Sequence, residues 1–266
     1  MEFLMNTDLT GKTALVCGST QGIGKACAMA LAGLGANVIL VARNETVLKS
    51  TLGSLDTDKN QTHQYLVADF TRPDALKTTI ENFVKTNGAV HILINNTGGP
   101  PGGPIIEAEI GSFQDTFNQH LVCNHLLVQA LLSGMKKEGY GRIINIISTS
   151  VKQPLKGLGV SNTIRAAVAN WAKTLAGEVA SFGITVNNVL PGATRTERLR
   201  TLIESKSKKS GKSTTELEEE MLKEIPAGRF GTADEIAAAV SFLASPAAGY
   251  ITGINLPVDG GRTGSL

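Results

Sequence analysis

Three glycines near the N-terminus have the spacing of a phosphate-binding turn. A short apolar run, Thr13 to Cys17, leads directly into Gly18-Ser19-Thr20-Gln21-Gly22-Ile23-Gly24, and a helical pattern follows. Glycine keeps such a turn tight and lets the backbone approach a pyrophosphate without interference from a β-carbon. The free N–H groups and positive dipole end of the following helix would then hold the phosphates. In this position, between a first strand and a first helix, the segment predicts a dinucleotide-binding site.

The residue at the end of the second predicted strand bears on which dinucleotide is bound. That strand ends Val41-Ala42-Arg43-Asn44, with a cation where a carboxylate would hydrogen-bond the adenosine ribose of NAD(H). A guanidinium there would instead neutralise the 2′-phosphate of NADP(H), so we expect NADP(H). Two alternatives stay open. Arg43 could be a solvated residue that opens the next helix, and Glu45 lies close enough in sequence to reach the ribose.

Strand and helix patterns alternate along the chain and define the elements that would position these groups. Short β-branched runs predict strands at residues 13–17, 38–41, 65–68, 91–94, 142–147, 184–189 and 251–256. Helical periodicity covers residues 23–34, 73–86, 112–136, 162–181 and 233–243. Several strands are almost wholly apolar, which is typical of a parallel sheet covered on both faces. We predict a single α/β domain over residues 1–266, a Rossmann-type doubly wound fold of about seven parallel strands with helices on both faces.

The composition excludes several classes of protein. The 266 residues carry a formal net charge of +2, too small for a nucleic-acid or anionic-membrane surface. No segment reaches the roughly 20 apolar residues of a membrane span, and no secretory signal is recognisable, so we expect a cytoplasmic protein. The three cysteines lack C-x-x-C spacing, which argues against a zinc site and against a disulfide framework.

Residues 195–223 differ in composition from the rest of the chain. A basic run from Ser205 to Lys212 is followed by the acidic stretch Glu216 to Glu220. Because the chain as a whole is nearly neutral, we interpret this segment as a solvated, mobile insertion and not as a nucleic-acid contact. We expect it to be a substrate lid within the single domain.

The spacing Gly18-x-x-x-Gly22-x-Gly24 resembles that of the short-chain dehydrogenase/reductase family, and the resemblance extends over nearly the whole chain. Asn95-Asn96-Thr97-Gly98 is similar to the family's Asn-Asn-Ala-Gly, although the loop opens Cys17-Gly18 where the family usually has Thr-Gly. The resemblance implies hydride transfer between a nicotinamide cofactor and a small carbonyl or alcohol substrate. Besides the glycine loop and Arg43, the cofactor contacts that it implies are Asp69, Phe70, Asn96, Thr97, Gly98, Arg165, Pro191, Gly192 and Thr196.

The family's catalytic positions fall on an unusual set of residues in this chain. The family's fifth strand resembles residues 141–148 and places the carbonyl-polarising serine at Ser148, while its Tyr-x-x-x-Lys falls on Ser161 and Arg165. The upstream asparagine position falls on His120. An alkyl hydroxyl titrates far above the phenol pKa of about 10, so Ser161 cannot replace a tyrosine as an acid. Arg165 keeps the charge and could hold a ribose diol, and His120 would titrate with a pKa of about 6.5.

No shift of the alignment recovers the missing tyrosine. The chain has Tyr65, Tyr140 and Tyr250, and none of them precedes a lysine by four residues. Since Tyr140 precedes the fifth predicted strand, we expect it at the opposite end of the sheet from the site. The loop Thr97 to Pro101 and the run Ser161 to Arg165 resemble a divergent branch of the family, similar to 3-oxoacyl-(acyl carrier protein) reductases but without the Tyr/Lys pair.

Two functions from different classes remain open, and nucleic-acid binding through Lys206 to Lys212 is a distant third. The first is an NADP(H)-dependent oxidoreductase in which Ser148 polarises a carbonyl and His120 or water transfers the proton. The second is a dinucleotide-binding protein without hydride transfer, which would act as a sensor or an assembly component. The predicted helix at residues 162–181 carries small residues that suit close helix contact, and family members pair this helix between subunits. We therefore expect a homotetramer, with a dimer as the next choice.

Overall fold

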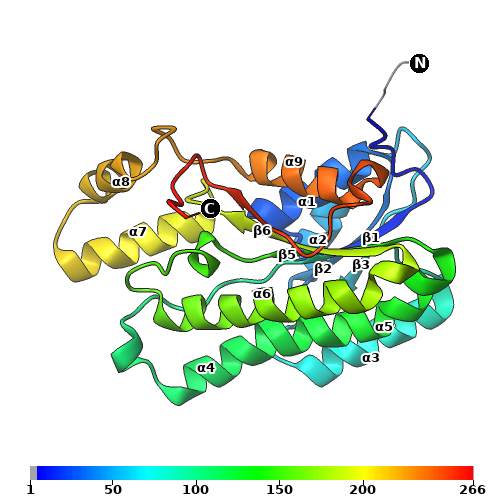
Figure 1. Ribbon diagram of the computed structural model, residues 1–266, viewed down its shortest axis with the longest axis horizontal. Helices are drawn as coiled ribbons and strands as arrows, with labels where there is room; N and C mark the ends of the chain where they lie inside the picture. The colour runs from blue at the N-terminus through cyan, green and yellow to red at the C-terminus, as the bar shows by residue number, and fades with distance from the viewer. Residues whose placement is uncertain (1–4, 266) are drawn as a thin grey trace.

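The computed structural model describes residues 5–265 and contains a parallel sheet covered by helices on both faces (Figure 1). The strand order is β3-β2-β1-β4-β5-β6-β7, and the winding reverses between β1 and β4, as in a doubly wound fold. The predicted fold class is therefore confirmed. The strands are β1 Thr13–Cys17, β2 Asn37–Ala42, β3 Gln64–Val67, β4 Ile92–Asn95, β5 Gly141–Ile146, β6 Ile184–Pro191 and β7 Asn255–Val258.

The helices divide between the two faces of the sheet. α1, α2 and α9 cover one face, and α3, α5 and α6 cover the other, with α4 packed against α6 (Figure 1). Their bounds are α1 Gly22–Gly33, α2 Glu45–Leu52, α3 Pro73–Asn87, α4 Ile110–Phe117, α5 Cys123–Glu138, α6 Gly159–Val179, α7 Glu197–Ser210, α8 Thr214–Lys223 and α9 Ala233–Ala244. Of the helices in the described residues, none combines the length and hydropathy needed to span a bilayer.

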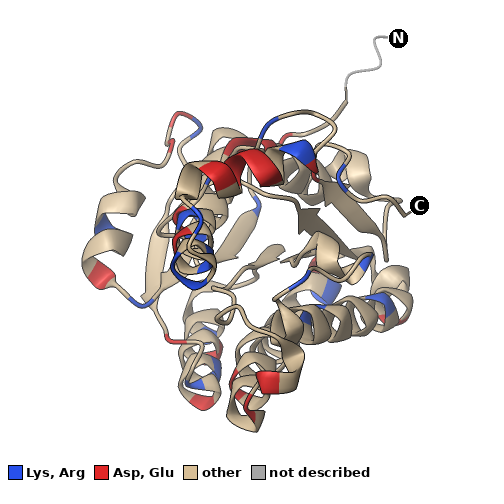
Figure 2. Cartoon of the chain, turned by 90° about the vertical axis from the view of Figure 1, so that its left-hand side faces the viewer, with Lys and Arg blue, Asp and Glu red and all other residues tan. Residues whose placement is uncertain are grey.

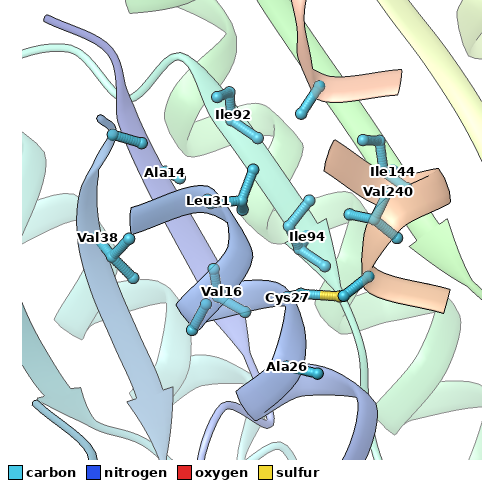
Figure 3. Close-up of a cluster of buried hydrophobic side chains, with 14 of the residues drawn as sticks. Ala14, Val16, Ala26, Cys27, Leu31, Val38, Ile92, Ile94, Ile144 and Val240 are labelled. Atoms are coloured by element: carbon cyan, nitrogen blue, oxygen red, sulfur yellow. The ribbon is translucent and has the colours of Figure 1, made fainter. Parts of the chain in front are cut away.

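A layer of apolar side chains fixes α1 against the sheet. Val16 of β1 and Leu31 of α1 are fully buried beside Ile94 of β4 and Val240 of α9 (Figure 3). Burying a Leu, Ile or Val side chain stabilises a fold by about 1.5–3 kcal/mol. Since the glycine loop joins β1 directly to α1, this packing also fixes the place where the loop turns.

A ladder of asparagine side chains crosses the sheet toward its carboxyl end. Asn95 donates to Asn145, Asn145 donates to Asn188, and Asn188 donates to Asn255, each from Nδ2 to Oδ1 at 2.8 Å. The parallel register aligns these four positions on neighbouring strands. An unpaired buried amide costs about 1–3 kcal/mol, so a slip of one strand would leave several of these groups without partners. The ladder therefore specifies the register next to the residues of the site.

Two boundaries differ from the sequence prediction. The last strand begins at Asn255 and not at residue 251, because Gly253 has a φ of +74° and interrupts the extended chain before it. The predicted helix at residues 112–136 is α4 and α5 joined by a π-helical turn, Asn118–Val122. This turn contains His120.

Residues 195–223, for which the sequence pattern predicts no helix, contain α7 and α8. Local groups explain both helices: Arg200 pairs with Glu197 and Glu204 along α7, and Ser213 and Glu216 form a capping box at the start of α8. Both helices extend beyond the carboxyl end of the sheet (Figure 1), and Figure 2 colours the basic and acidic positions along the chain, seen from the side on which these helices lie. Lys212, in the segment between α7 and α8, forms an ion pair with Glu220 of α8.

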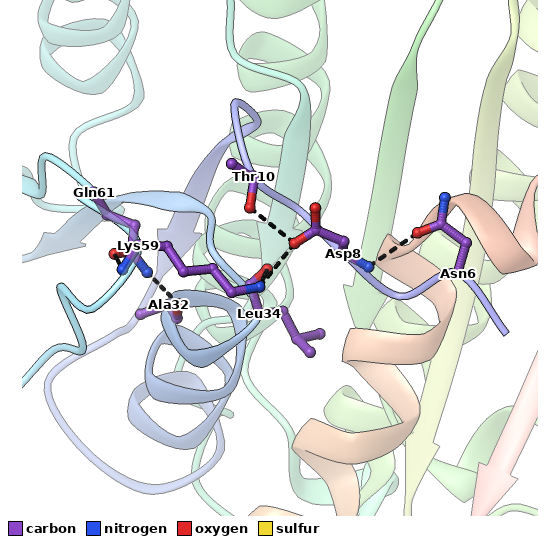
Figure 4. Close-up of polar contacts among 7 residues, drawn as sticks. All are labelled: Asn6, Asp8, Thr10, Ala32, Leu34, Lys59 and Gln61. Carbon is purple, nitrogen blue, oxygen red and sulfur yellow. Dashed lines mark hydrogen bonds and ion pairs between the residues drawn. The ribbon is translucent and has the colours of Figure 1, made fainter. Parts of the chain in front are cut away.

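The N-terminal segment is attached at the amino end of the strands. Asp8 accepts hydrogen bonds from Lys59 Nζ and Thr10 Oγ1, both at 2.8 Å, and Gln61 Nε2 donates to Ala32 O at 2.7 Å (Figure 4). Lys59 and Asp8 are about half exposed, so their ion pair contributes little to stability. These contacts leave the carboxyl end of the sheet free.

Candidate active site

The glycine loop lies at the carboxyl end of β1. Gly18 and Gly22 have φ of +60° and +53°, in the left-handed region that favours glycine. A β-carbon on Gly24 would lie 2.6 Å from Asn96 Nδ2 and closer still to Gly18 O, so this position requires glycine. The N-cap residue Gln21 makes no side-chain hydrogen bond to the first turn of α1, which leaves its N–H groups available to an anion. The loop therefore fits the phosphates of a dinucleotide.

One side chain that follows β4 and one within the loop hold the glycine loop in place. Asn96 Nδ2 donates to Cys17 O at 3.2 Å and to Gly18 O at 3.4 Å. Ser19 is fully buried, and its Oγ donates to Val41 O at 3.4 Å. Ser19 and Asn96 are thus occupied in shaping the loop, whereas Thr20, Gln21 and Ile23 remain partly or fully exposed along it.

Arg43 and Asp69 follow the ends of β2 and β3, which pair directly. The Thr71 backbone N–H donates to Asp69 and lowers the pKa of its carboxyl, and the positive charge of Arg43 lowers that pKa further. Arg43 is exposed and forms no ion pair with a carboxylate of residues 5–265. Phe70 is half-buried against the apolar layer between the sheet, α3 and α5.

Glu45, the sequence alternative for the ribose, is engaged elsewhere. It pairs with Lys49 at 2.9 Å and accepts a hydrogen bond from Tyr65 at 3.0 Å. These contacts hold its carboxylate along α2, while Arg43 keeps its guanidinium unengaged. This arrangement favours the cation as the group that meets the adenosine end of a cofactor.

His120 is buried against the chain that follows β4. Thr97 Oγ1 lies 2.9 Å from Nδ1, and Gly98 O lies 3.1 Å from Nε2. Both contacts are satisfied when Nε2–H donates to Gly98 O and Nδ1 accepts from the Thr97 hydroxyl. Burial lowers the pKa of His120 to about 3, and the positive charges of Arg165 and Arg198 act in the same direction. The imidazole is therefore neutral at neutral pH, in contrast to the pKa of about 6.5 expected from residue type.

Ser161 and Arg165 lie one turn apart on α6. Arg165 Nε donates to Ser161 Oγ at 3.1 Å, and its Nη1 donates to Ile146 O and Ile147 O at 3.2 and 2.7 Å. These carbonyls belong to the end of β5 and the residue after it. Burial lowers the pKa of Arg165 to about 10, so the side chain is still a cation at neutral pH. Only Nη2 remains to contact a bound molecule.

Ser148 is half-buried directly after these carbonyls. Its Oγ accepts a hydrogen bond from the Ser150 backbone N–H at 3.1 Å. Because that contact uses a lone pair and not the hydroxyl proton, Ser148 keeps its O–H free to donate to a ligand. The cation of Arg165 is anchored to the carbonyl of the preceding residue, Ile147.

The chain after β6 brings a third group of residues to the same end of the sheet. Gly192 N donates to Val258 O at 3.0 Å, and a β-carbon on Gly192 would lie 2.7 Å from Asp259, so the turn after Pro191 requires glycine. Thr196 caps α7, and its methyl group lies 3.4 Å from the β-carbon position of Gly22. The start of α7 therefore touches the glycine loop.

Arg198, in the first turn of α7 after Thr196, is a site residue that the sequence did not predict. Its Nη2 donates to Pro100 O in the proline-glycine loop after β4. No signal in the pattern singled it out, because α7 itself was not predicted.

Comparisons with known proteins agree with this geometry. Residues 18–263 match the family model described as enoyl-(acyl carrier protein) reductase. Over 257 residues the chain is 36% identical to a 3-oxoacyl-(acyl-carrier-protein) reductase of Vibrio cholerae, which covers 96% of this chain and 98% of the relative. The chain belongs to the short-chain dehydrogenase/reductase family. It is therefore an enzyme of the NAD(P)-dependent oxidoreductase type.

Solved structures of the family are similar over the whole chain. L-sorbose reductase from Gluconobacter frateurii, complexed with NADPH and L-sorbose, has a TM-score of 0.91 at 30% identity and covers 98% of this chain and 100% of its own. YwfH, an NADPH-dependent reductase involved in bacilysin biosynthesis, has a TM-score of 0.89 at 31% identity and covers 96% and 99%.

The three tyrosines occupy other parts of this family member. Tyr140 lies at the amino end of β5, as the sequence predicts, and its hydroxyl donates to Ala244 O at 2.6 Å. Tyr65 donates to Glu45, and Tyr250 is fully exposed between α9 and β7. The hydroxyls that meet at the candidate site are therefore those of serine and threonine.

Proposed function

We propose that this protein is an NADP(H)-dependent oxidoreductase that transfers hydride between the nicotinamide and a small carbonyl or alcohol substrate. The observation that carries the proposal is the shaped cofactor cradle, in which Asn96 closes the glycine loop and Arg43 stands unpaired at the end of β2. The cofactor, when bound, would supply the hydride. Several solved relatives carry NADPH or NADP, which supports a phosphate-bearing cofactor here.

Ser148 is the residue that we assign to the reacting oxygen. Its free O–H would donate to the carbonyl oxygen as negative charge develops there, and the cation of Arg165 would stabilise the same charge. In the direction of reduction, hydride goes to the carbonyl carbon and one proton goes to the oxygen. The hydroxyl of Ser161 is too weak an acid to give up its proton, and His120 is not an imidazolium near pH 7, so we assign the proton to water.

The substrate class is narrowed only by analogy with relatives. Their names give 3-oxoacyl groups on an acyl carrier protein for one and L-sorbose for another, and both substrates carry a carbonyl group. We propose a carbonyl compound or the corresponding alcohol, with the loop at residues 99–104 and the lid at residues 195–223 as the specificity elements.

A second candidate is a dinucleotide-binding protein without hydride transfer. It is favoured by one observation: the site brings together Ser161, Arg165 and a neutral His120, none of which titrates as an acid near neutral pH. Detectable NADPH oxidation that scales with protein concentration would eliminate this candidate.

The deciding experiment begins with calorimetric titration of the protein with NADPH and NADH, followed by a carbonyl screen that monitors NADPH oxidation. We expect NADPH to bind more tightly than NADH and Ser148→Ala to lower turnover by about 10²-fold or more. Ser150→Ala is the matched control, because its Oγ has no hydrogen-bond partner in the described residues and it removes a neighbouring hydroxyl. Failure of both nucleotides to bind, or full activity of Ser148→Ala, would overturn the proposal.

A further inference from the structure

Two arginine side chains converge on Gly99 in the loop after β4. The Nη2 atoms of Arg165 and Arg198 lie 3.3 and 3.2 Å from the position that a β-carbon on Gly99 would occupy. Arg165 comes from α6 and Arg198 from the first turn of α7, so two separate elements bring their charges together. A β-carbon at position 99 would be in tight contact with both guanidinium groups, which would have to shift by a few tenths of an ångström.

Neither of these charges is neutralised by the protein. No carboxylate of residues 5–265 forms an ion pair with Arg165 or Arg198, whereas Arg200, two residues further along α7, pairs with Glu197 and Glu204. Partial burial lowers the pKa of Arg198, and burial together with the charge of Arg198 lowers the pKa of Arg165. Two like charges in a partly desolvated place repel each other, and an anion bound between them would remove that cost.

The free hydrogen-bond donors point to the same conclusion. The Nε and Nη1 of Arg165 donate within the protein, but its Nη2 has no acceptor among the described residues. Arg198 uses Nη2 for Pro100 O, and its other nitrogens have no acceptor within residues 5–265. A planar carboxylate has two oxygens that can accept from two guanidinium groups at once.

We propose that Arg165 and Arg198 bind a carboxylate group of the substrate, so that this enzyme acts on oxo acids in preference to neutral carbonyl compounds. The assignment rests on the proposed function, since it names the substrate class of the same site. The anionic groups of the cofactor already have their own places, at the N-terminus of α1 and at Arg43. The arginine pair lies instead between Ser161, which accepts from Arg165, and Pro100 of the proline-glycine loop, which accepts from Arg198.

The test uses substrates in matched pairs that differ only in charge. Phenylglyoxylate is compared with its methyl ester, and acetoacetate with methyl acetoacetate, in NADPH-oxidation assays and in calorimetric titrations of the NADP⁺ complex. Wild-type enzyme should prefer each acid. Arg198→Gln should lower kcat/KM for the acid about ten- to hundredfold relative to the ester, which is the effect of losing one charge-assisted hydrogen bond.

Arg200→Gln is the matched control, because it removes the same charge from the same helix but its guanidinium is paired with glutamates. It should keep the wild-type acid preference, and Arg198→Lys, which retains the charge, should recover part of it. Equal use of acid and ester by the wild type, or an unchanged preference in Arg198→Gln, would overturn the assignment. A weakened NADPH affinity in Arg198→Gln would also overturn it, because the anion would then belong to the cofactor.

The two proposals fail in different ways. If NADPH does not bind at all, the proposed function is wrong, and titration of the protein with phenylglyoxylate and its ester still tests the arginine pair. If NADPH binds and esters are reduced as well as acids, the oxidoreductase proposal stands and the carboxylate site is wrong.

Discussion

Both ring nitrogens of His120 are hydrogen-bonded to neighbouring oxygens in a buried place, and this makes the stability of the fold depend on pH. The unfolded chain would protonate the residue with a pKa of about 6.5, whereas the folded protein holds it neutral down to about 3. Between these values the unfolded state binds more protons than the folded state. Stability contributed by this group is therefore present above pH 6.5 and is lost as the pH falls below it.

The expected loss can be measured by urea unfolding at pH 7 and pH 5. A folded pKa of about 3 implies that His120 alone removes about 2 kcal/mol of unfolding free energy between these pH values. His120→Gln should lose less stability over the same interval than the wild type. His125→Gln, at an exposed position of α5, is the control for removing a histidine while His120 stays in place. Equal pH dependence in wild type and His120→Gln would show that folding does not lower the pKa of His120, and the neutral imidazole would then be wrong.

At the scale of elements, the close packing of Gly24 against Gly18 and Asn96 should determine whether the glycine loop can bind the cofactor. Gly24→Ala places a methyl group against Gly18 O and Asn96, so the loop must open or α1 must shift. We expect at least a tenfold loss of NADPH affinity and a lower melting temperature. Gly33→Ala, at the other end of α1, meets no atom within 4 Å and should keep the affinity while raising helix propensity. Normal NADPH binding by Gly24→Ala would mean that the cradle is not the nucleotide site.

The elements also show which features the sequence could predict. The strand pattern identified the sheet because buried parallel strands are apolar on both sides, and the glycine spacing identified the first turn because its requirements are local. Arg198 was not predicted, since it belongs to a charged helix without a regular apolar pattern. The asparagine ladder could not be predicted from the sequence either, because its four residues become neighbours only in the folded register.

The pKa of His120 is a third property that the sequence could not predict. Its position was predicted from the resemblance, but its ionisation depends on burial and on Thr97, Gly98 and two arginines, which come from separate segments. Residue type alone therefore gave the wrong pKa. The glycine spacing of the loop is a local signal, whereas the closure of the loop by Asn96 and the ionisation of His120 depend on tertiary contacts.

At the scale of the whole molecule, the outer face of α6 is the surface where we expect subunits to meet. Ala166 and Gly177 are exposed along it, while residues such as Val168 and Ala172 on the opposite face are buried. The neighbouring α4 adds Ile110, which is 72% exposed. Small exposed residues allow a close helix contact, and exposed apolar side chains favour burial against a partner.

A single charge placed on this face should separate the subunits. We expect the wild type to sediment as a homotetramer and Ala166→Glu to shift toward smaller species, because two copies of the glutamate would approach each other across a paired α6. Ala75→Glu introduces the same change at an exposed alanine of α3 and should leave the assembly intact. Sedimentation velocity at equal protein concentrations distinguishes these outcomes. A monomeric wild type would show that α6 is not an interface. An intact Ala166→Glu tetramer would show that the subunits meet at another surface, because two carboxylates facing each other at close range on α6 would repel.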